Sequence, residues 1–110
     1  MLQQAMERFA GKTLIRDRYD NFIGGQWVAP ARGAYFDNIS PVTGQVVCQV
    51  ARGTAEDIEA ALDAAHAAKD SWGKLSSTER SNILLKMADR MEANLDLIAL
   101  AETIDNGKPI

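Results

Sequence analysis

The side chains that most often carry covalent or metal chemistry are scarce in this sequence. It holds one cysteine, Cys48, and one histidine, His66. A nucleophilic cysteine needs a nearby cation, histidine or helix N-terminus to stabilise its thiolate. Cys48 instead lies inside the apolar run VVCQV, which predicts a small buried side chain. His66 stands among alanines, and we expect a partly exposed structural residue, because one histidine and one distant cysteine make neither a zinc site nor a catalytic pair.

Two carboxylates near the end of the sequence are the next candidates. Glu102 and Asp105 are three residues apart in the run AETIDNGKPI and share one side of an expected helix. They could form an acid–base pair, bind a cation, or simply be surface charge, the usual role of helix carboxylates. The Gly-Lys pairs at 11–12 and 107–108 do not match a phosphate-binding loop, because the first lacks the leading glycine and proline follows the second. No G-x-G-x-x-G fingerprint of a dinucleotide site occurs.

Composition narrows the class of protein. The 110 residues are 46% hydrophobic and 25% charged with a net charge of −3, as in a soluble globular domain. Nucleic acid is not an expected partner, since that would need a basic surface. The apolar runs are too short for a membrane span, and the first residues lack the apolar core of a signal peptide. A single cysteine permits no internal disulfide, which favours the reducing cytoplasm.

The first half of the chain predicts short antiparallel strands. We expect strands at about 20–23 and 26–28, joined by Gly24-Gly25, because glycine adopts the positive φ angles of a hairpin turn. Further strands are expected near 35–39 and over 45–51, with the sequence PVTG forming the turn at 41–44.

The second half predicts three amphipathic helices. Capping boxes at Thr54/Asp57 and Ser76/Glu79 mark the first two starts, Asn94 separates the second helix from the third, and Gly73 and Gly107 are expected stops. Trp27 and Trp72 are expected to anchor the core or an interface. One face of the first helix is expected to carry a largely apolar stripe of Ile58, Ala61, Leu62, Ala65, Ala68 and Trp72, with Lys69 on the same face. On residues alone, this is an acidic α+β domain with no self-contained active site.

Five motifs follow one another in this sequence: I-G-G-x-W, the P-x-T-G turn, an alanine-rich helix ending in S-W, E-R-x-x-I-L-x-K-x-A-D, and E-T-x-D-N-G-K-P. Together they resemble the N-terminal portion of the NAD(P)-dependent aldehyde dehydrogenase superfamily, from about Tyr19 to Ile110. The sequence is most similar in detail to bacterial members that act on acetaldehyde-like substrates. Ser40 and Gln45 depart from the family, where asparagine and glutamate are common.

The resemblance implies an α+β fragment of an α/β fold, with a variable segment at 1–18 and an incomplete cofactor-binding domain at 19–110. It implies an enzyme that is a homo-oligomer when full length and that oxidises a small-molecule aldehyde to a carboxylic acid with NAD or NADP. The family's catalytic and cofactor-binding residues lie downstream, so none is assigned here, and the isolated 110 residues are expected to be inactive. The resemblance also implies a monovalent-cation site formed by the backbone carbonyl of Ile39 and the carboxylate of Asp105.

A second hypothesis keeps the same ancestry without catalysis. A shortened, stand-alone module would bind a partner protein through the apolar stripes of its helices. The sequence does not distinguish NAD from NADP, and it identifies neither the aldehyde nor the order of the oligomer.

Overall fold

The structure is a computed structural model that describes residues 15–110. Most of the expected variable segment 1–18, with the Gly-Lys pair at 11–12, lies outside the described residues. The described strands are β1 (Arg18–Tyr19), β2 (Asn21–Ile23), β3 (Gln26–Val28), β4 (Tyr35–Ile39) and β5 (Val46–Ala51). The described helices are α2 (Ala55–Lys74), α3 (Ser77–Ala93) and α4 (Leu95–Asn106). The short strands followed by three helices confirm the expected fold class.

The strands form two sheets. β2 and β3 make the expected antiparallel hairpin, in which Gly24 and Gly25 have φ angles of 59° and 79°. The other sheet has the order β1–β5–β4, with β4 antiparallel to β5. β1 was not predicted, because two residues are too few to show an alternating pattern. It pairs in parallel with β5, so the β region is not wholly antiparallel as expected.

The helix boundaries follow the capping signals closely. At the start of α3, the Ser76 N–H donates to the Glu79 carboxylate and the Glu79 N–H donates to the Ser76 hydroxyl. Asn94 separates α3 from α4. Gly107 ends α4 in the left-handed region at φ 78°, as predicted. Gly73 was the wrong stop: α2 continues to Lys74, and Leu75 ends it in an extended conformation.

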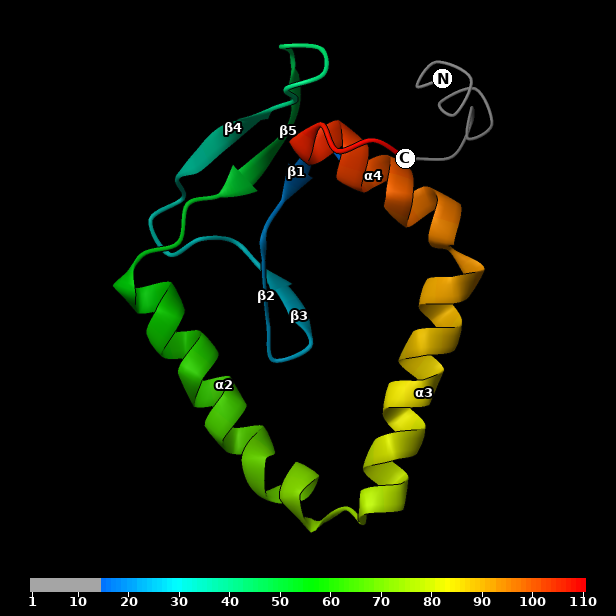
Figure 1. The fold of residues 1–110 in the computed structure, drawn as a ribbon. Helices are drawn as coiled ribbons and strands as arrows, with labels where there is room; N and C mark the ends of the chain where they lie inside the picture. Colours follow the sequence, from blue (N-terminus) through cyan, green and yellow to red (C-terminus); the bar gives the residue numbers. More distant parts are fainter. Residues whose placement is uncertain (1–14) are drawn as a thin grey trace.

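The helices α2, α3 and α4 follow one another in an open ring, with the β2–β3 hairpin inside it (Figure 1). α2 runs away from the three-stranded sheet, α3 returns, and α4 lies beside that sheet, while the β2–β3 hairpin lies on the α2 side of the space between them. The radius of gyration is 17.4 Å, against about 13 Å for a compact domain of this length. The described residues therefore bury less apolar surface than a compact domain of the same size.

The buried core is correspondingly small. Among residues 15–110 it consists of Cys48 and Ala51 from β5 and Leu100 and Ile104 from α4. The burial of Cys48 confirms the prediction of a small structural side chain.

The expected apolar stripe of α2 is not covered by the described residues. Ile58 and Leu62 are exposed, and Trp27 and Trp72 are 50% and 42% exposed, so neither tryptophan belongs to the core of the described residues. The helix itself was predicted correctly, but the described part of the chain supplies no packing partner for the stripe, so its role as a packing face stays a prediction.

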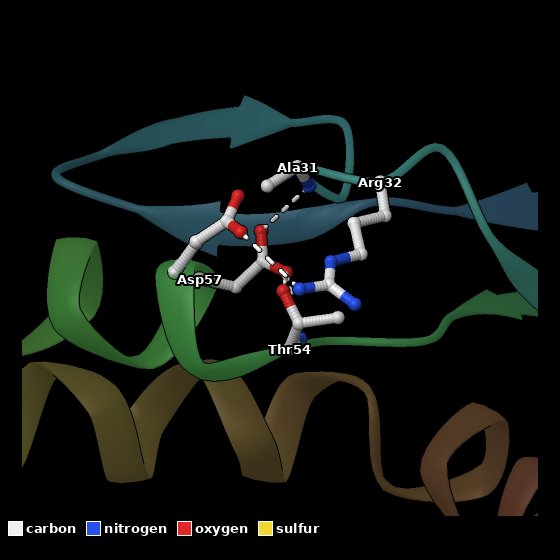
Figure 2. A network of polar contacts seen from close by, with 5 residues as sticks. Ala31, Arg32, Thr54 and Asp57 are labelled. Atoms are coloured by element: carbon white, nitrogen blue, oxygen red, sulfur yellow. Dashed lines mark hydrogen bonds and ion pairs between the residues drawn. The ribbon is translucent and has the colours of Figure 1, made fainter.

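Asp57 instead ties α2 to the loop that follows β3 (Figure 2). Its buried carboxylate accepts hydrogen bonds from the backbone N–H of Thr54 at 2.8 Å, the backbone N–H of Ala31 at 2.9 Å and the Thr54 hydroxyl at 3.2 Å. These donors, the Thr54 N–H first, hold the pKa of Asp57 below its ordinary value. Beside them, Arg32 and Glu56 form an exposed ion pair at 3.6 Å. One carboxylate thus caps the helix and fixes the loop.

We expect Asp57→Asn to lower the midpoint of thermal unfolding by several degrees, because an amide places a donor against the backbone N–H groups. Since the folded pKa of Asp57 is depressed, its contribution to stability is complete above the ordinary carboxyl pKa and is lost as pH falls through the folded value. Acid titration followed by circular dichroism should therefore show a shallower loss of stability below about pH 4 in the variant. Asp63→Asn, on the exposed surface of the same helix, is the matched control and should leave the profile unchanged.

We also expect Gly107→Ala to destabilise the chain more than Gly25→Ala. Both glycines have φ near 78°, which costs an alanine about 1 kcal/mol. A Cβ at Gly107 would lie 3.3 Å from Cγ of Pro41, whereas a Cβ at Gly25 would meet no atom within 4 Å. Urea unfolding measures both variants. Equal losses of unfolding free energy would mean that the contact between the new Cβ at position 107 and Pro41 adds nothing to the cost of the substitution.

Candidate functional site at the end of α4

Two hydrogen bonds dock the last turn of α4 on β4 and the turn that follows it. The Asn38 side-chain amide donates to Oδ1 of Asp105 at 2.8 Å, and the Ser40 hydroxyl donates to the Ile104 carbonyl at 2.5 Å. The Ser40 hydroxyl also accepts from the backbone N–H of Val42 at 3.2 Å, so this buried group is satisfied as both donor and acceptor. Segments more than sixty positions apart in the sequence are joined at this point.

The run after Asp105 is held by its own hydrogen bonds. The Asn106 amide donates to Glu102 at 2.7 Å, and Asn106 Oδ1 accepts from the Lys108 N–H at 2.9 Å. The Thr103 hydroxyl donates to the Lys108 carbonyl at 2.6 Å. Glu102 and Asp105 therefore bind different partners, Asn106 and Asn38, and these contacts do not support an acid–base pair.

The structure places the two predicted cation ligands on segments that are hydrogen-bonded to each other. Ile39 lies between Asn38 and Ser40, whose side chains bind Asp105 and Ile104. The pairing register of β4 with β5 also shifts between Asn38 and Ile39, which interrupts the regular ladder there. A carboxylate and a backbone carbonyl are ligands suited to a hard cation. Within residues 15–110, however, no cluster of three or more His, Cys, Asp or Glu side chains could hold a metal ion.

Sequence reasoning missed the two residues that make this joint. Asn38 was assigned no role, and Ser40 was noted only as a departure from a family pattern. A serine next to a proline at the start of a turn is a local signal for side-chain hydrogen bonding to the backbone. That signal accounts for the bond to the Val42 N–H, but it could not reveal the bond to α4.

His66 takes no part in this site, and Cys48 meets it only through the Asn38 amide. The buried thiol lies 3.9 Å from the Asn38 amide nitrogen, and the exposed His66 ring lies 2.9 Å from the carbonyl of Leu62 on its own helix. These contacts suit the structural roles expected for both residues. Along the described residues, none of the helices combines the length and apolarity that crossing a lipid bilayer requires.

Comparison with known proteins extends these observations. Residues 27–110 match the profile described as "Aldehyde dehydrogenase family". The chain is 68% identical over 96 residues to an aldehyde dehydrogenase of Deinococcus radiodurans, covering 87% of this chain and 19% of that protein. It is 65% identical over 99 residues to a long-chain-aldehyde dehydrogenase of an Acinetobacter species, covering 90% of this chain and 20% of that protein.

Solved structures agree with the sequence matches. An indole-3-acetaldehyde dehydrogenase in its apo form superimposes with a TM-score of 0.87 at 34% identity, covering 98% of this chain and 25% of that one. A structure of an enzyme of that name complexed with NAD+ has a TM-score of 0.82 at 31% identity, covering 94% of this chain and 21% of that one. The chain therefore spans about a fifth of the length of the curated relatives it matches. With the profile matching most of its residues, it belongs to the aldehyde dehydrogenase family.

Proposed function

We propose that this chain forms part of an enzyme that oxidises an aldehyde to a carboxylic acid with NAD or NADP. The match of residues 27–110 to the aldehyde dehydrogenase family carries the proposal. The structural similarity to an NAD+ complex supports a nicotinamide cofactor. In this proposal, residues 19–110 are the N-terminal part of the cofactor-binding domain, and the enzyme is a cytoplasmic homo-oligomer.

The described residues contribute scaffold rather than reacting groups. In such an enzyme a thiolate attacks the aldehyde, a hydride passes to the nicotinamide, and water hydrolyses the thioester. The only thiol here, Cys48, is buried in β5 and contacts the Asn38 amide, so it is not placed to attack a substrate. Because the chain has no dinucleotide fingerprint, we assign none of its residues to the cofactor.

The substrate is proposed only as an aldehyde. The named relatives differ in the aldehydes they are called after, one long-chain and one indole-3-acetaldehyde. The acetaldehyde-like substrate implied by the resemblance to bacterial members therefore stays a prediction. The exposed apolar faces of α2 and α3 would also suit a stand-alone interaction module, but 68% identity to an enzyme does not favour that alternative.

We further propose that Ile39 and Asp105 supply two oxygen ligands to a monovalent cation. Asn38 fixes one carboxylate oxygen of Asp105 beside the strand that carries Ile39. Two ligands do not complete the coordination of such an ion, so water or other carbonyl oxygens would have to complete it. In this arrangement the cation would strengthen the joint between α4 and β4 by bridging its two sides.

A segment exchange tests the enzymatic proposal. We expect the 110-residue chain alone to form no NADH from an aldehyde and NAD+. A chimera whose matched segment of the Deinococcus radiodurans enzyme is replaced by this chain should stay within about tenfold of that enzyme's kcat/KM, a change of roughly 1.4 kcal/mol in transition-state free energy. Turnover by the isolated chain would contradict the proposal, and so would a soluble, folded chimera that has lost all activity.

The cation proposal is tested on the same chimera by thermal unfolding in potassium chloride, in sodium chloride and in choline chloride at equal ionic strength. We expect one of the two metal salts to raise the unfolding midpoint above that in choline, because only the state with the joint formed binds the ion. Asp105→Asn keeps an oxygen that can accept from Asn38 but removes the charge, and it should abolish the difference between salts. Asp89→Asn on α3 should preserve it. A difference that survives Asp105→Asn would exclude this carboxylate as a ligand.

A further inference from the structure

The last residue of α4 is an asparagine followed by glycine, a pair that is capable of spontaneous covalent chemistry. Asn106-Gly107 is the one place in the sequence where asparagine precedes glycine. The backbone nitrogen that follows an asparagine can attack Cγ of its side chain, and glycine has no Cβ to hinder the approach. Both residues are exposed, so water reaches them. Asn106 is therefore suited to deamidation, and the surrounding structure decides how readily it reacts.

The reaction needs only the chain and water. The Gly107 nitrogen loses its proton and bonds to Cγ of Asn106, and the side-chain amide takes up that proton and leaves as ammonia. The product is a cyclic succinimide. Water that adds at Cγ breaks the new bond and gives aspartate. Water that adds at the main-chain carbonyl of Asn106 breaks the original peptide bond and gives isoaspartate, whose main chain runs through Cβ and Cγ. No oxidation or reduction takes place.

The folded turn holds both reacting groups. The Gly107 N–H donates to the Thr103 carbonyl at 2.8 Å, so the proton that has to leave is held in the last turn of the helix. The Asn106 side chain donates to Oε1 of Glu102 at 2.7 Å and accepts from the Lys108 N–H at 2.9 Å. The side chain that has to rotate is thus fixed at both ends. Deamidation therefore requires an opened turn.

The joint between α4 and β4 determines how often this turn opens. Ile104 and Asp105, the two residues before Asn106, are held by the Ser40 hydroxyl at 2.5 Å and by the Asn38 amide at 2.8 Å. The ends of helices open locally at a lower free energy than the whole fold. A reaction that proceeds only from the open turn has a rate proportional to the population of that open state. The two hydrogen bonds of the joint therefore act on the chemistry of Asn106.

We propose that Asn106 is a deamidation site whose rate is set by the docking of α4, and that the reaction in turn loosens that docking. In the product, a carboxylate replaces the amide that now lies 2.7 Å from Glu102, so a hydrogen-bond donor is exchanged for a like charge. The new charge also lies at the C-terminus of α4, where the helix dipole disfavours an anion. The inference is independent of the proposed function, because only the described residues carry it.

Isoaspartate adds a further constraint. It lengthens the main chain by one atom directly before Gly107, which ends α4 in the left-handed region close to Pro41. The hydrogen bonds on either side of this position are matched to a main chain of ordinary length. Deamidation and opening of the turn therefore reinforce each other, and hydrolysis of the ring makes the change one-way.

The protection is measured in the chimera described above and in the 110-residue chain. Deamidation of each protein is followed in mildly alkaline buffer by mass spectrometry of peptides. We expect Asn106 to react about tenfold or more slowly in buffer than in guanidinium chloride, because the folded turn has to open first. The readout needs no enzymatic activity, so an inactive but folded chimera would count against the proposed function alone. Equal rates in buffer and denaturant in both proteins would overturn the proposal.

A pair of serine variants tests the control by the joint. Ser40→Ala removes the buried hydroxyl that holds the last turn, and it should raise the rate at Asn106 in buffer about fivefold without changing the rate in denaturant. Ser71→Ala is the matched control, because its hydroxyl donates to the Ala68 carbonyl within α2 at 3.0 Å, away from the joint. It should leave both rates unchanged.

Asn38→Ala distinguishes local opening from global unfolding. It removes the more exposed of the two contacts, so the helix content measured by circular dichroism should be retained while Asn106 reacts about twofold or more faster in buffer. If Ser40→Ala loses the helix signal, Asn38→Ala alone decides. A folded Asn38→Ala protein in which Asn106 reacts at the parent rate would show that docking does not govern the site.

The effect of the product is tested by making it directly. Asn106→Asp is the aspartate product, and it should lower the midpoint of thermal unfolding by a few degrees, because its carboxylate faces Glu102. Asn82→Asp adds the same charge on the exposed surface of α3 and should not lower the midpoint. Equal midpoints for the two variants would overturn the claim that the reaction loosens the docking of α4.

Discussion

The docking of α4 beside the three-stranded sheet is the interaction on which the described arrangement depends. Leu100 and Ile104 of α4 are buried, and they provide half of the small apolar core of the described residues. The Ser40 hydroxyl and the Asn38 amide then bind the last turn of the helix. A hydroxyl bonded to an end carbonyl of a helix satisfies a group that has no partner within the helix itself. Apolar burial supplies the attraction, and the polar contacts set the position at which the helix stops.

The position of α3 follows from the docking of α4 and from the Asp57 network at the start of α2. Asp57 fixes the start of α2 to the loop after β3, and α2 leaves the sheet from there. The last turn of α4 is held at the sheet, so α3 connects the end of α2 with the start of α4, which lies away from that sheet (Figure 1). Helices in proteins gain most of their stability from packing an apolar face. α3 has no buried residue among those described, so within this part of the chain its stability depends on its capping box and its helix propensity.

The parts of the fold that sequence could predict are those whose physics is local. The glycine pair of the hairpin, the Ser76/Glu79 capping box and the left-handed Gly107 each act within a few residues, and all were predicted from the sequence. Pairing across long separations was not predictable in this way. β1 contributes only two residues and meets β5 thirty-one positions later, which no periodicity in either segment indicates. The stripe of α2 shows the intermediate case, because a pattern can reveal an apolar face but not the surface that covers it.

The same distinction explains the candidate site. Sequence identified Asp105 as notable and left open an acid–base pair with Glu102, a cation site and plain surface charge, of which surface charge was favoured on the residues alone. Hydrogen bonding separates the two carboxylates, because Glu102 is engaged by Asn106 in its own helix whereas Asp105 is engaged by Asn38 from the sheet. Most of the polar groups in the run DNGKP are accounted for by holding the end of α4 in place. The residue types in this run are therefore explained largely by the contacts that hold the end of α4. The one group left to explain by chemistry is the carboxylate of Asp105, beside the interrupted end of β4.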